Sequence, residues 1–141
     1  MNPESPALAT FCLPVRVYYE DTDAAGVVYY ASYFRFFERC RTEWLRTLGY
    51  GQAQLAAEEN RVFVVKSASA EYHRPARLDD ALAISLAVEK MGRSQVILRQ
   101  EARRGDTVLV TGVVQVVCVN SEKMKAAAIP EALRKKLESC S

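Results

Sequence analysis

The chain has 141 residues, of which 50% are hydrophobic and 26% charged, with a formal net charge of +2 at neutral pH. This composition excludes an intrinsically disordered chain, and the balanced charge argues against a dedicated nucleic-acid-binding protein. We therefore expect a single domain over residues 1–141, with residues 1–10 as a flexible leader.

Signals for export, membrane insertion and metal binding are missing from the sequence. The first ten residues have neither the basic nor the apolar segment of a secretory signal peptide, and no stretch reaches the roughly 18 uncharged apolar residues of a membrane span. The four cysteines fit neither a metal-binding spacing nor a redox pair. We expect a cytoplasmic protein without a metal site, whose cysteines are core residues or inert surface thiols.

The clearest pattern in the chain predicts a long amphipathic helix from Ser32 to Leu48. Apolar residues recur there at steps of three and four and form one stripe: Tyr33, Phe36, Phe37, Cys40, Trp44, Leu45 and Leu48. We expect Ser32 to cap the start of this helix, Gly49 to end it, and Arg39 to pair with Glu43 one turn later.

Most of the remaining chain has the pattern of strands. Apolar and small or polar residues alternate most clearly between Leu82 and Glu89. The predicted strands are residues 15–19, 61–72, 82–89, 95–103 and 107–120, separated by a loop at 20–26 and turns at 91–94 and 104–106, with a short helix at 130–138.

This order of elements predicts an α+β fold in which an antiparallel sheet wraps around one central helix. After the first strand and the long helix, we expect the other four strands to follow one another as a meander. Strand 107–120 is apolar on both faces, and one helix cannot cover both faces of a sheet. We therefore expect another subunit to cover part of it, in a homodimer or homotetramer.

The candidate chemistry lies between residues 15 and 39. Asp23 is on a loop just before the long helix, whose first N–H groups are unpaired and carry partial positive charge. A carbonyl oxygen placed there would be polarised, and a nearby carboxylate can attack the carbonyl or activate a water. This suits acyl transfer from a thioester, whose thiolate leaves without a strong general acid. From the residues alone, the alternative that residues 21–23 only form a turn stays open.

Two blocks of the sequence resemble the 4-hydroxybenzoyl-CoA thioesterase family of hot-dog folds, and most of all its Tol–Pal-associated, YbgC-type branch. The resemblance covers about residues 13–137. The first block comprises Tyr19-Glu20-Asp21-Thr22-Asp23, Gly26-Val27-Val28-Tyr29, Tyr33 to Arg39 and Arg41 to Leu45, and the second runs from Ala70 to Asp80.

The resemblance implies a hot-dog fold, a five-stranded antiparallel sheet wrapped around one long helix. It also implies hydrolysis of an acyl-CoA to free acid and CoA, with no cofactor because CoA is part of the substrate. It assigns Asp23 as nucleophile or general base, and the backbone N–H of Tyr30 as the group that polarises the carbonyl. Spacing alone does not separate Asp23 from Asp21, since residues two apart in an extended stretch share a face, and the family match favours Asp23.

Two further implications concern partners. Family members have active sites between two subunits, which agrees with the expected homo-oligomer. The Tol–Pal association of the branch leaves peripheral partners at the cell envelope open. The alternative function, a non-catalytic acyl-CoA-binding or scaffold subunit of the same fold, also stays open.

Position 30 departs from the YbgC-type branch, which usually has His there. The hydroxybenzoyl-CoA branch is similar to this sequence in having Tyr, so we expect the Tyr30 side chain to influence which acyl group fits. Tyr18, Tyr29 and Tyr33 are candidates for lining the acyl pocket, with packing in the core as the alternative.

Other polar residues are candidates for contacts with the nucleotide or for structural roles. Arg and Lys side chains and a Gly-Arg-Ser turn suit the phosphates of CoA, with solvated surface charge as the alternative for each of Arg74, Arg77, Lys90, Arg93 and Ser94. We expect a structural or surface role for His73, the only histidine, with a general-base role, which the family does not place there, as the alternative. No His precedes Glu38 to complete a dehydratase pair, so we expect Glu38 to form a surface salt bridge. The alternative is that it positions the water, as a lone helix Glu does in other hot-dog branches.

Overall fold

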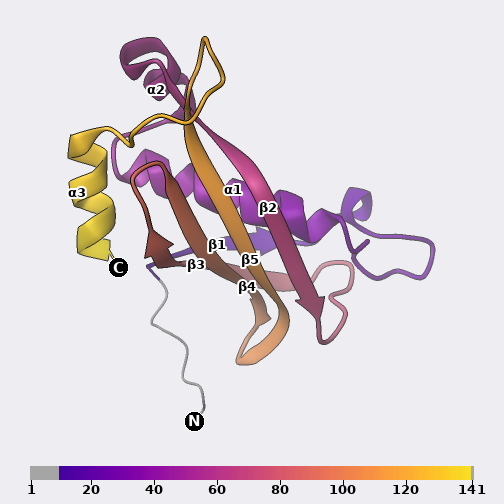
Figure 1. Cartoon of the computed structure of the whole chain (residues 1–141). Coiled ribbons are helices and arrows are strands. Elements are labelled where there is room, and N and C mark those ends of the chain that lie inside the picture. Colours follow the sequence, from indigo (N-terminus) through magenta and orange to yellow (C-terminus); the bar gives the residue numbers. More distant parts are fainter. Residues whose placement is uncertain (1–9, 141) are drawn as a thin grey trace.

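The structure is a computed structural model that describes residues 10–140, so the expected leader lies outside the described residues except for Thr10. Its elements are β1 (Phe11–Arg16), the 3-10 turn η1 (Tyr19–Asp21), α1 (Ser32–Thr47), α2 (Gln52–Glu59), β2 (Arg61–Tyr72), β3 (Ala81–Met91), β4 (Gln95–Arg104), β5 (Thr107–Asn120) and α3 (Glu131–Cys140). The strands form one antiparallel sheet in the order β1-β3-β4-β5-β2. Figure 1 shows them lying across α1, with α3 at the end of the molecule away from the loop that precedes α1.

The α+β class and the antiparallel sheet are confirmed, but the predicted meander is wrong for β2. Only β3, β4 and β5 follow one another as neighbours, whereas β2 pairs with β5 at the far edge of the sheet. Residues 73–80 therefore cross from one edge strand to β3 instead of forming a tight turn. They are held by the loop before α1, since Val28 N–H donates to the Ala76 carbonyl at 2.8 Å.

The first strand lies earlier than predicted, at Phe11–Arg16 instead of 15–19. Pro14 is accommodated because β1 is an edge strand, where a missing N–H removes no bond to a second neighbour. Beyond β1, Tyr18 N–H donates to the Asp21 carboxylate at 2.9 Å and begins η1. The α2 helix was not predicted, because Leu55 is its only buried residue and it therefore carries no apolar stripe.

The long helix is confirmed, and its apolar stripe faces the sheet. Six of the seven stripe residues are buried in α1, and Leu48, just beyond its last residue, is partly buried against the core. A polar contact fixes the helix on β4. The buried Gln100 side chain donates to the Phe37 carbonyl at 3.1 Å and accepts from Arg41 at 3.0 Å.

Gly49 ends α1 as predicted. It takes a φ of +89°, which favours glycine, and its N–H donates to the Arg46 carbonyl at 3.0 Å. Tyr50 N–H donates to the Leu45 carbonyl at 2.9 Å, which completes a Schellman motif. The predicted pair of Arg39 with Glu43 is wrong, because Glu43 pairs with Arg46 instead.

The state of the cysteines agrees with the expectation of core residues or inert surface thiols. All four cysteines are free, with Cys40 and Cys118 buried. Burial raises the pKa of the Cys40 thiol to about 12, which makes this thiol inert at neutral pH. Within residues 10–140, no helix has the length and apolar character needed to cross a membrane.

Close approach of α1 to the sheet depends on Gly112 in β5. A Cβ atom at this position would lie 2.7 Å from the ring of Phe37, which is fully buried, and 3.3 Å from the Ser69 carbonyl oxygen. The absent side chain therefore leaves room for the Phe37 ring of α1 against β5.

We expect Gly112→Ala to destabilise the fold by about 1–3 kcal/mol, because the Phe37 ring has no free space to move into. Thermal and urea unfolding of the variant measure this loss. Phe37→Leu creates a cavity of its own, so the double variant should be no less stable than Phe37→Leu alone. A double variant that loses the sum of both effects would show that Phe37 is not the obstacle.

Candidate active site

Asp23 lies in a tight turn of a small hairpin between Thr22 and Val28, which pair with each other. Asp23 N–H donates to the Val27 carbonyl at 2.9 Å, and Gly26 N–H donates to the Asp23 carbonyl at 3.0 Å. Gly26 has a φ of +80°, so the turn requires a residue that tolerates the left-handed region. The spacing between Asp23 and Gly26 in the first sequence block is therefore the spacing that this turn requires.

The Asp23 carboxylate is exposed and only partly used by the turn. One of its oxygens accepts the Ala25 N–H at 2.8 Å. The other oxygen has no hydrogen-bond partner among residues 10–140. Asp23 therefore offers a solvent-facing oxygen that can reach a substrate or a water.

The start of α1 leaves backbone donors open beside this hairpin. Tyr29 N–H donates to the Asp21 carbonyl at 2.8 Å, and Ser32 N–H donates to the Tyr29 carbonyl at 2.8 Å. Within the described part of the chain, the N–H groups of Tyr30 and Ala31 have no acceptor. These two groups lie at the positive end of the helix dipole, where a carbonyl oxygen is stabilised.

Ser32 does not cap the helix as predicted, because it is the first helical residue and Ala31 takes the N-cap position. Its hydroxyl instead donates to the Asp21 carbonyl at 3.4 Å and accepts from the Arg35 guanidinium at 2.9 Å. Ser32 thus joins the helix to the preceding loop, and its side chain caps neither the Tyr30 nor the Ala31 N–H.

Asp21 and Asp23 occupy opposite environments, which spacing alone did not reveal. Asp21 is 2% exposed, and its carboxylate accepts the Tyr18 N–H and lies 3.6 Å from the Arg35 guanidinium. Its other carboxylate oxygen, Oδ1, is buried and has no hydrogen-bond partner in the described chain. Asp21 therefore holds the loop in place, and Asp23 is the acid that a ligand can reach.

A cavity of about 260 Å³ lies next to Tyr30. The second sequence block supplies one wall and the start of α1 the other. Its lining residues are Val28, Tyr30, Tyr33, Tyr72, His73, Arg74 and Pro75. The aromatic walls suit an apolar group, and the open N–H of Tyr30 belongs to one of the lining residues.

The predicted acyl-pocket tyrosines have different positions. Tyr33 is buried and lines the cavity, and its hydroxyl accepts the Ala76 N–H at 3.2 Å. Burial raises the pKa of the Tyr33 phenol, which keeps it neutral at physiological pH. Tyr29 is not part of the lining and packs on the Tyr30 ring with centroids 4.7 Å apart. Tyr18 lines a separate, more open hollow with Tyr19.

The predicted phosphate ligands do not gather at one place in a single chain. Arg74 lines the cavity. Arg93 and Ser94 form the turn between β3 and β4, whose carbonyls accept N–H groups of Ile129 and Cys118 at the α3 end of the molecule. Figure 1 shows that this end is opposite the start of α1. Arg77 and Lys90 are exposed.

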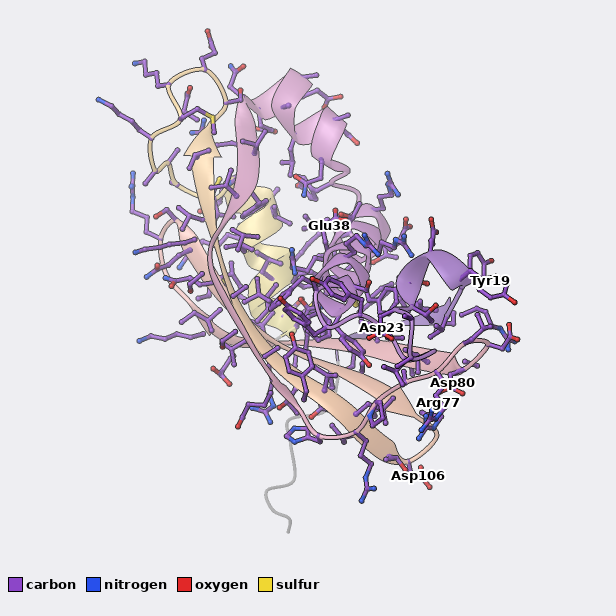
Figure 2. All side chains as sticks on the ribbon, turned by 90° about the vertical axis from the view of Figure 1, so that its right-hand side faces the viewer. Tyr19, Asp23, Glu38, Arg77, Asp80 and Asp106 are labelled. Carbon is purple, nitrogen blue, oxygen red and sulfur yellow. The ribbon has the colours of Figure 1, made fainter. Side chains whose placement is uncertain are left out.

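His73 and Glu38 are both exposed, but only His73 lies at the cavity. A ring nitrogen of His73 lies 3.0 Å from the Thr111 hydroxyl, which fits the expected structural role. Glu38 forms no ion pair with a described residue, contrary to prediction, and instead accepts a hydrogen bond from Thr42 at 2.7 Å. Figure 2 shows Glu38 further along α1, apart from Asp23.

The connection 73–80 is fixed to the sheet by Asp80. One oxygen of its carboxylate accepts the Arg77 N–H at 2.8 Å and the Arg104 guanidinium at 2.7 Å. Burial alone raises the pKa of Asp80, but these hydrogen bonds and the charges of both arginines outweigh it and lower the pKa below its usual value. Figure 2 shows Asp80 and Arg77 side by side below Asp23.

Sequence reasoning missed two residues of this site. Tyr72, the last residue of β2, donates its hydroxyl to the Tyr30 carbonyl at 3.2 Å. It was quoted within the second block, at the end of a predicted strand, without a role. Asp80 was quoted within that block without a role.

In the described residues no group of three or more His, Cys, Asp or Glu side chains is arranged to hold a metal ion.

Comparisons with known proteins agree on one family. The sequence matches the family model of the thioesterase-like superfamily over residues 17–137. An acyl-CoA thioesterase YbgC of Haemophilus influenzae is 44% identical over 124 residues, which cover 88% of this chain and 91% of the relative. An acyl-CoA thioester hydrolase YbgC of Escherichia coli is 48% identical over 124 residues, which cover 87% and 92%.

A solved structure supports the same assignment of the fold. The crystal structure of a probable thioesterase from Bartonella henselae matches with a TM-score of 0.81 at 35% identity, and covers 84% of this chain and 98% of that one. Together with the five-stranded antiparallel sheet around α1, this match confirms the expected hot-dog fold.

The lowered pKa of Asp80 makes part of the stability dependent on pH. A carboxyl whose pKa is lower in the folded state stabilises the fold in full above its unfolded pKa of about 4, and loses this effect as pH falls through its folded pKa. We expect Asp80→Asn to cost about 1 kcal/mol or less at pH 7, and its melting temperature to converge with that of the parent in acid.

Melting curves between pH 7 and strongly acidic pH measure this convergence. Asp106→Asn is the matched control, because Asp106 is exposed in the β4–β5 turn and has no hydrogen bond to another described residue. A difference between Asp80→Asn and the parent that grows in acid would contradict the assigned role of Asp80.

Proposed function

The chain belongs to the thioesterase-like superfamily, and on this premise we propose that it hydrolyses the thioester of an acyl-CoA to free acid and CoA. The observation that carries the proposal is the open N–H of Tyr30 beside an aromatic cavity, at a helix start held by the same loop as Asp23. This arrangement supplies both an electrophilic donor and a carboxylate for acyl transfer.

In the proposed reaction the thioester carbonyl oxygen accepts the Tyr30 N–H, and the partial positive charge of the helix start stabilises the developing oxyanion. Asp23 acts in one of two ways. As nucleophile, its carboxylate oxygen bonds to the carbonyl carbon, the carbon–sulfur bond breaks, and water then hydrolyses the anhydride. As general base, it takes a proton from a water whose oxygen attacks the carbonyl, and the CoA thiolate leaves.

The acyl group is proposed to occupy the cavity between Tyr30 and Pro75, whose walls are mostly aromatic. Arg74 at its edge is the candidate for a phosphate of CoA, because a guanidinium pairs well with phosphate. A panel of short, long and aromatic acyl-CoAs, with thiol release measured by a thiol reagent, identifies the preferred acyl group.

We also propose that the working form is a homodimer or homotetramer joined along β2. The β1 edge is short and contains Pro14, which hinders pairing, whereas the β2 edge is twelve residues long without proline. Residues 65–69 of β2 are exposed, and Val65 is 50% exposed. An exposed edge of this length offers unpaired backbone groups to a second copy.

Such pairing also explains the position of the phosphate candidates. In a two-fold symmetric antiparallel pair, the Tyr72 end of β2 lies beside the Arg61 end of the second copy. The β3–β4 turn with Arg93 and Ser94 lies at the Arg61 end, since Gln95 and Val64 both pair with Val117. Each site would therefore receive these two residues from the other subunit.

We place the protein in the cytoplasm, where a reducing environment keeps its four cysteines free. Peripheral partners at the cell envelope remain an additional proposal from the resemblance to the Tol–Pal-associated branch. Neither proposal affects the chemistry of the site.

We expect Asp23→Asn to lower kcat by roughly a hundredfold or more, because the amide can neither attack the carbonyl nor take a proton. Its melting temperature should change little, since the carboxylate is exposed. For Asp21→Asn we expect the opposite pattern, a clear loss of stability with a much smaller loss of kcat. It places an amide in a buried site next to Arg35, so it should lose about 1–3 kcal/mol of stability and much less activity.

Steady-state hydrolysis of the best acyl-CoA and melting curves of both variants measure this contrast. A folded Asp23→Asn variant within a few-fold of the parent would reduce Asp23 to a turn residue. A parent protein that binds acyl-CoA without releasing thiol from any member of the panel would favour the alternative, a non-catalytic acyl-CoA-binding subunit.

For the oligomer, we expect a mass of at least twice the 15.8 kDa of one chain at micromolar concentration, measured by light scattering or sedimentation. Val65→Lys, which adds a charge to the exposed β2 edge, should shift the mass toward that of one chain. A parent protein with the mass of a single chain would contradict the proposed assembly.

A further inference from the structure

Tyr72 joins the sheet to the group that polarises the carbonyl in the proposed function. Its hydroxyl donates to the Tyr30 carbonyl at 3.2 Å, and the rings of the two residues meet edge to face with centroids 6.3 Å apart. The Tyr72 ring also lies 5.7 Å from the ring of Tyr33, so it forms part of the cavity wall.

The sheet holds Tyr72 firmly, which makes it a suitable anchor. Tyr72 is paired with Val110 in the register of β2 and β5. The next two residues, His73 and Arg74, both donate their N–H groups to the Leu109 carbonyl, at 2.8 and 3.1 Å. The backbone on either side of the ring is therefore fixed to β5.

The backbone N–H and carbonyl of Tyr30, in contrast, make few hydrogen bonds. Its N–H has no acceptor among residues 10–140, and its side chain is 59% exposed. Within the described residues, its carbonyl accepts only the Tyr72 hydroxyl and, at 3.4 Å, the N–H of Tyr33. Removal of the Tyr72 hydroxyl would leave one long hydrogen bond on the Tyr30 carbonyl, which is joined to the electrophilic N–H through the Tyr30 Cα.

We propose that Tyr72 is a positioning and specificity residue of the thioesterase site. Its hydroxyl holds the Tyr30 carbonyl and, through the Cα of Tyr30, helps to fix the direction of the Tyr30 N–H toward the thioester carbonyl. Its ring shapes the cavity that takes the acyl group. The proposal rests on the proposed function. It adds a residue from β2, far from the first sequence block, to the two groups assigned there.

The two roles of Tyr72 respond to different substitutions. Tyr72→Phe removes the hydroxyl and keeps the ring, so it should lower kcat about 3- to 10-fold, the rate equivalent of one neutral hydrogen bond, with little change in KM. The order of preference among acyl groups should stay that of the parent. Tyr72→Leu also removes the ring and should change this order, with bulky aromatic acyl groups affected differently from linear ones.

The experiment measures kcat and KM of the parent and both variants on the same panel of acyl-CoAs, with melting curves alongside. Tyr50→Phe is the matched control, because Tyr50 lies beyond the opposite end of α1 and its ring contacts Lys136. This variant should retain the kcat of the parent. A purely structural role of Tyr72 would lower the melting temperature and leave kcat and the acyl preference unchanged.

The outcomes separate this inference from the function on which it rests. An active parent with an unchanged kcat in Tyr72→Phe overturns the positioning role, and an unchanged acyl preference in Tyr72→Leu overturns the specificity role. A parent that hydrolyses no acyl-CoA overturns the proposed function itself, and the inference with it.

Discussion

The hydrogen bond from the Tyr29 N–H to the Asp21 carbonyl is the constraint on which the site depends. It closes the hairpin that carries Asp23 and brings the chain into α1 in the same step. The Val28 N–H, donating to the Ala76 carbonyl, fixes the hairpin to the connection before β3. With these donors used, the next N–H along the chain, that of Tyr30, is left open. The turn and the helix start therefore form one unit and do not move independently.

Asp21 and Asp23 are two residues apart but differ in burial, and this difference gives them different roles. Asp21 is desolvated and held by the Tyr18 N–H and the Arg35 guanidinium, so its position is determined by the fold. Asp23 is exposed and gives one oxygen to its own turn. A buried charge that lost its partners would be costly, whereas an exposed charge can exchange partners with water or substrate at little cost. The rigid acid thereby keeps the accessible one in place.

Local pattern was enough to predict α1, the bounds of β2 and β5 and the glycine that ends α1, because these depend on periodicity and on residues nearby in sequence. The place of β2 in the sheet was not predictable, since its pairing with β5 joins residues as distant as Arg61 and Asn120. For the same reason the contact of Tyr72 with Tyr30 was not predictable, because it depends on the place of β2 at the edge of the sheet. Asp23 and Tyr30 were assigned through the family resemblance, which could be recognised because the first block is one nearly continuous segment, and their roles stay a prediction.

The position of β2 at the far edge also bears on the order in which the protein folds. The hairpins between β3, β4 and β5 join neighbouring segments and can form early, whereas β2 pairs with β5 only across residues 73–106, which include β3 and β4. Since Tyr72 comes from β2, a chain that had formed only the β3–β4–β5 meander would hold most of its sheet and still lack a wall of the cavity. Catalytic competence would then appear with the slowest, most non-local contacts, so that partly folded chains present no misassembled site.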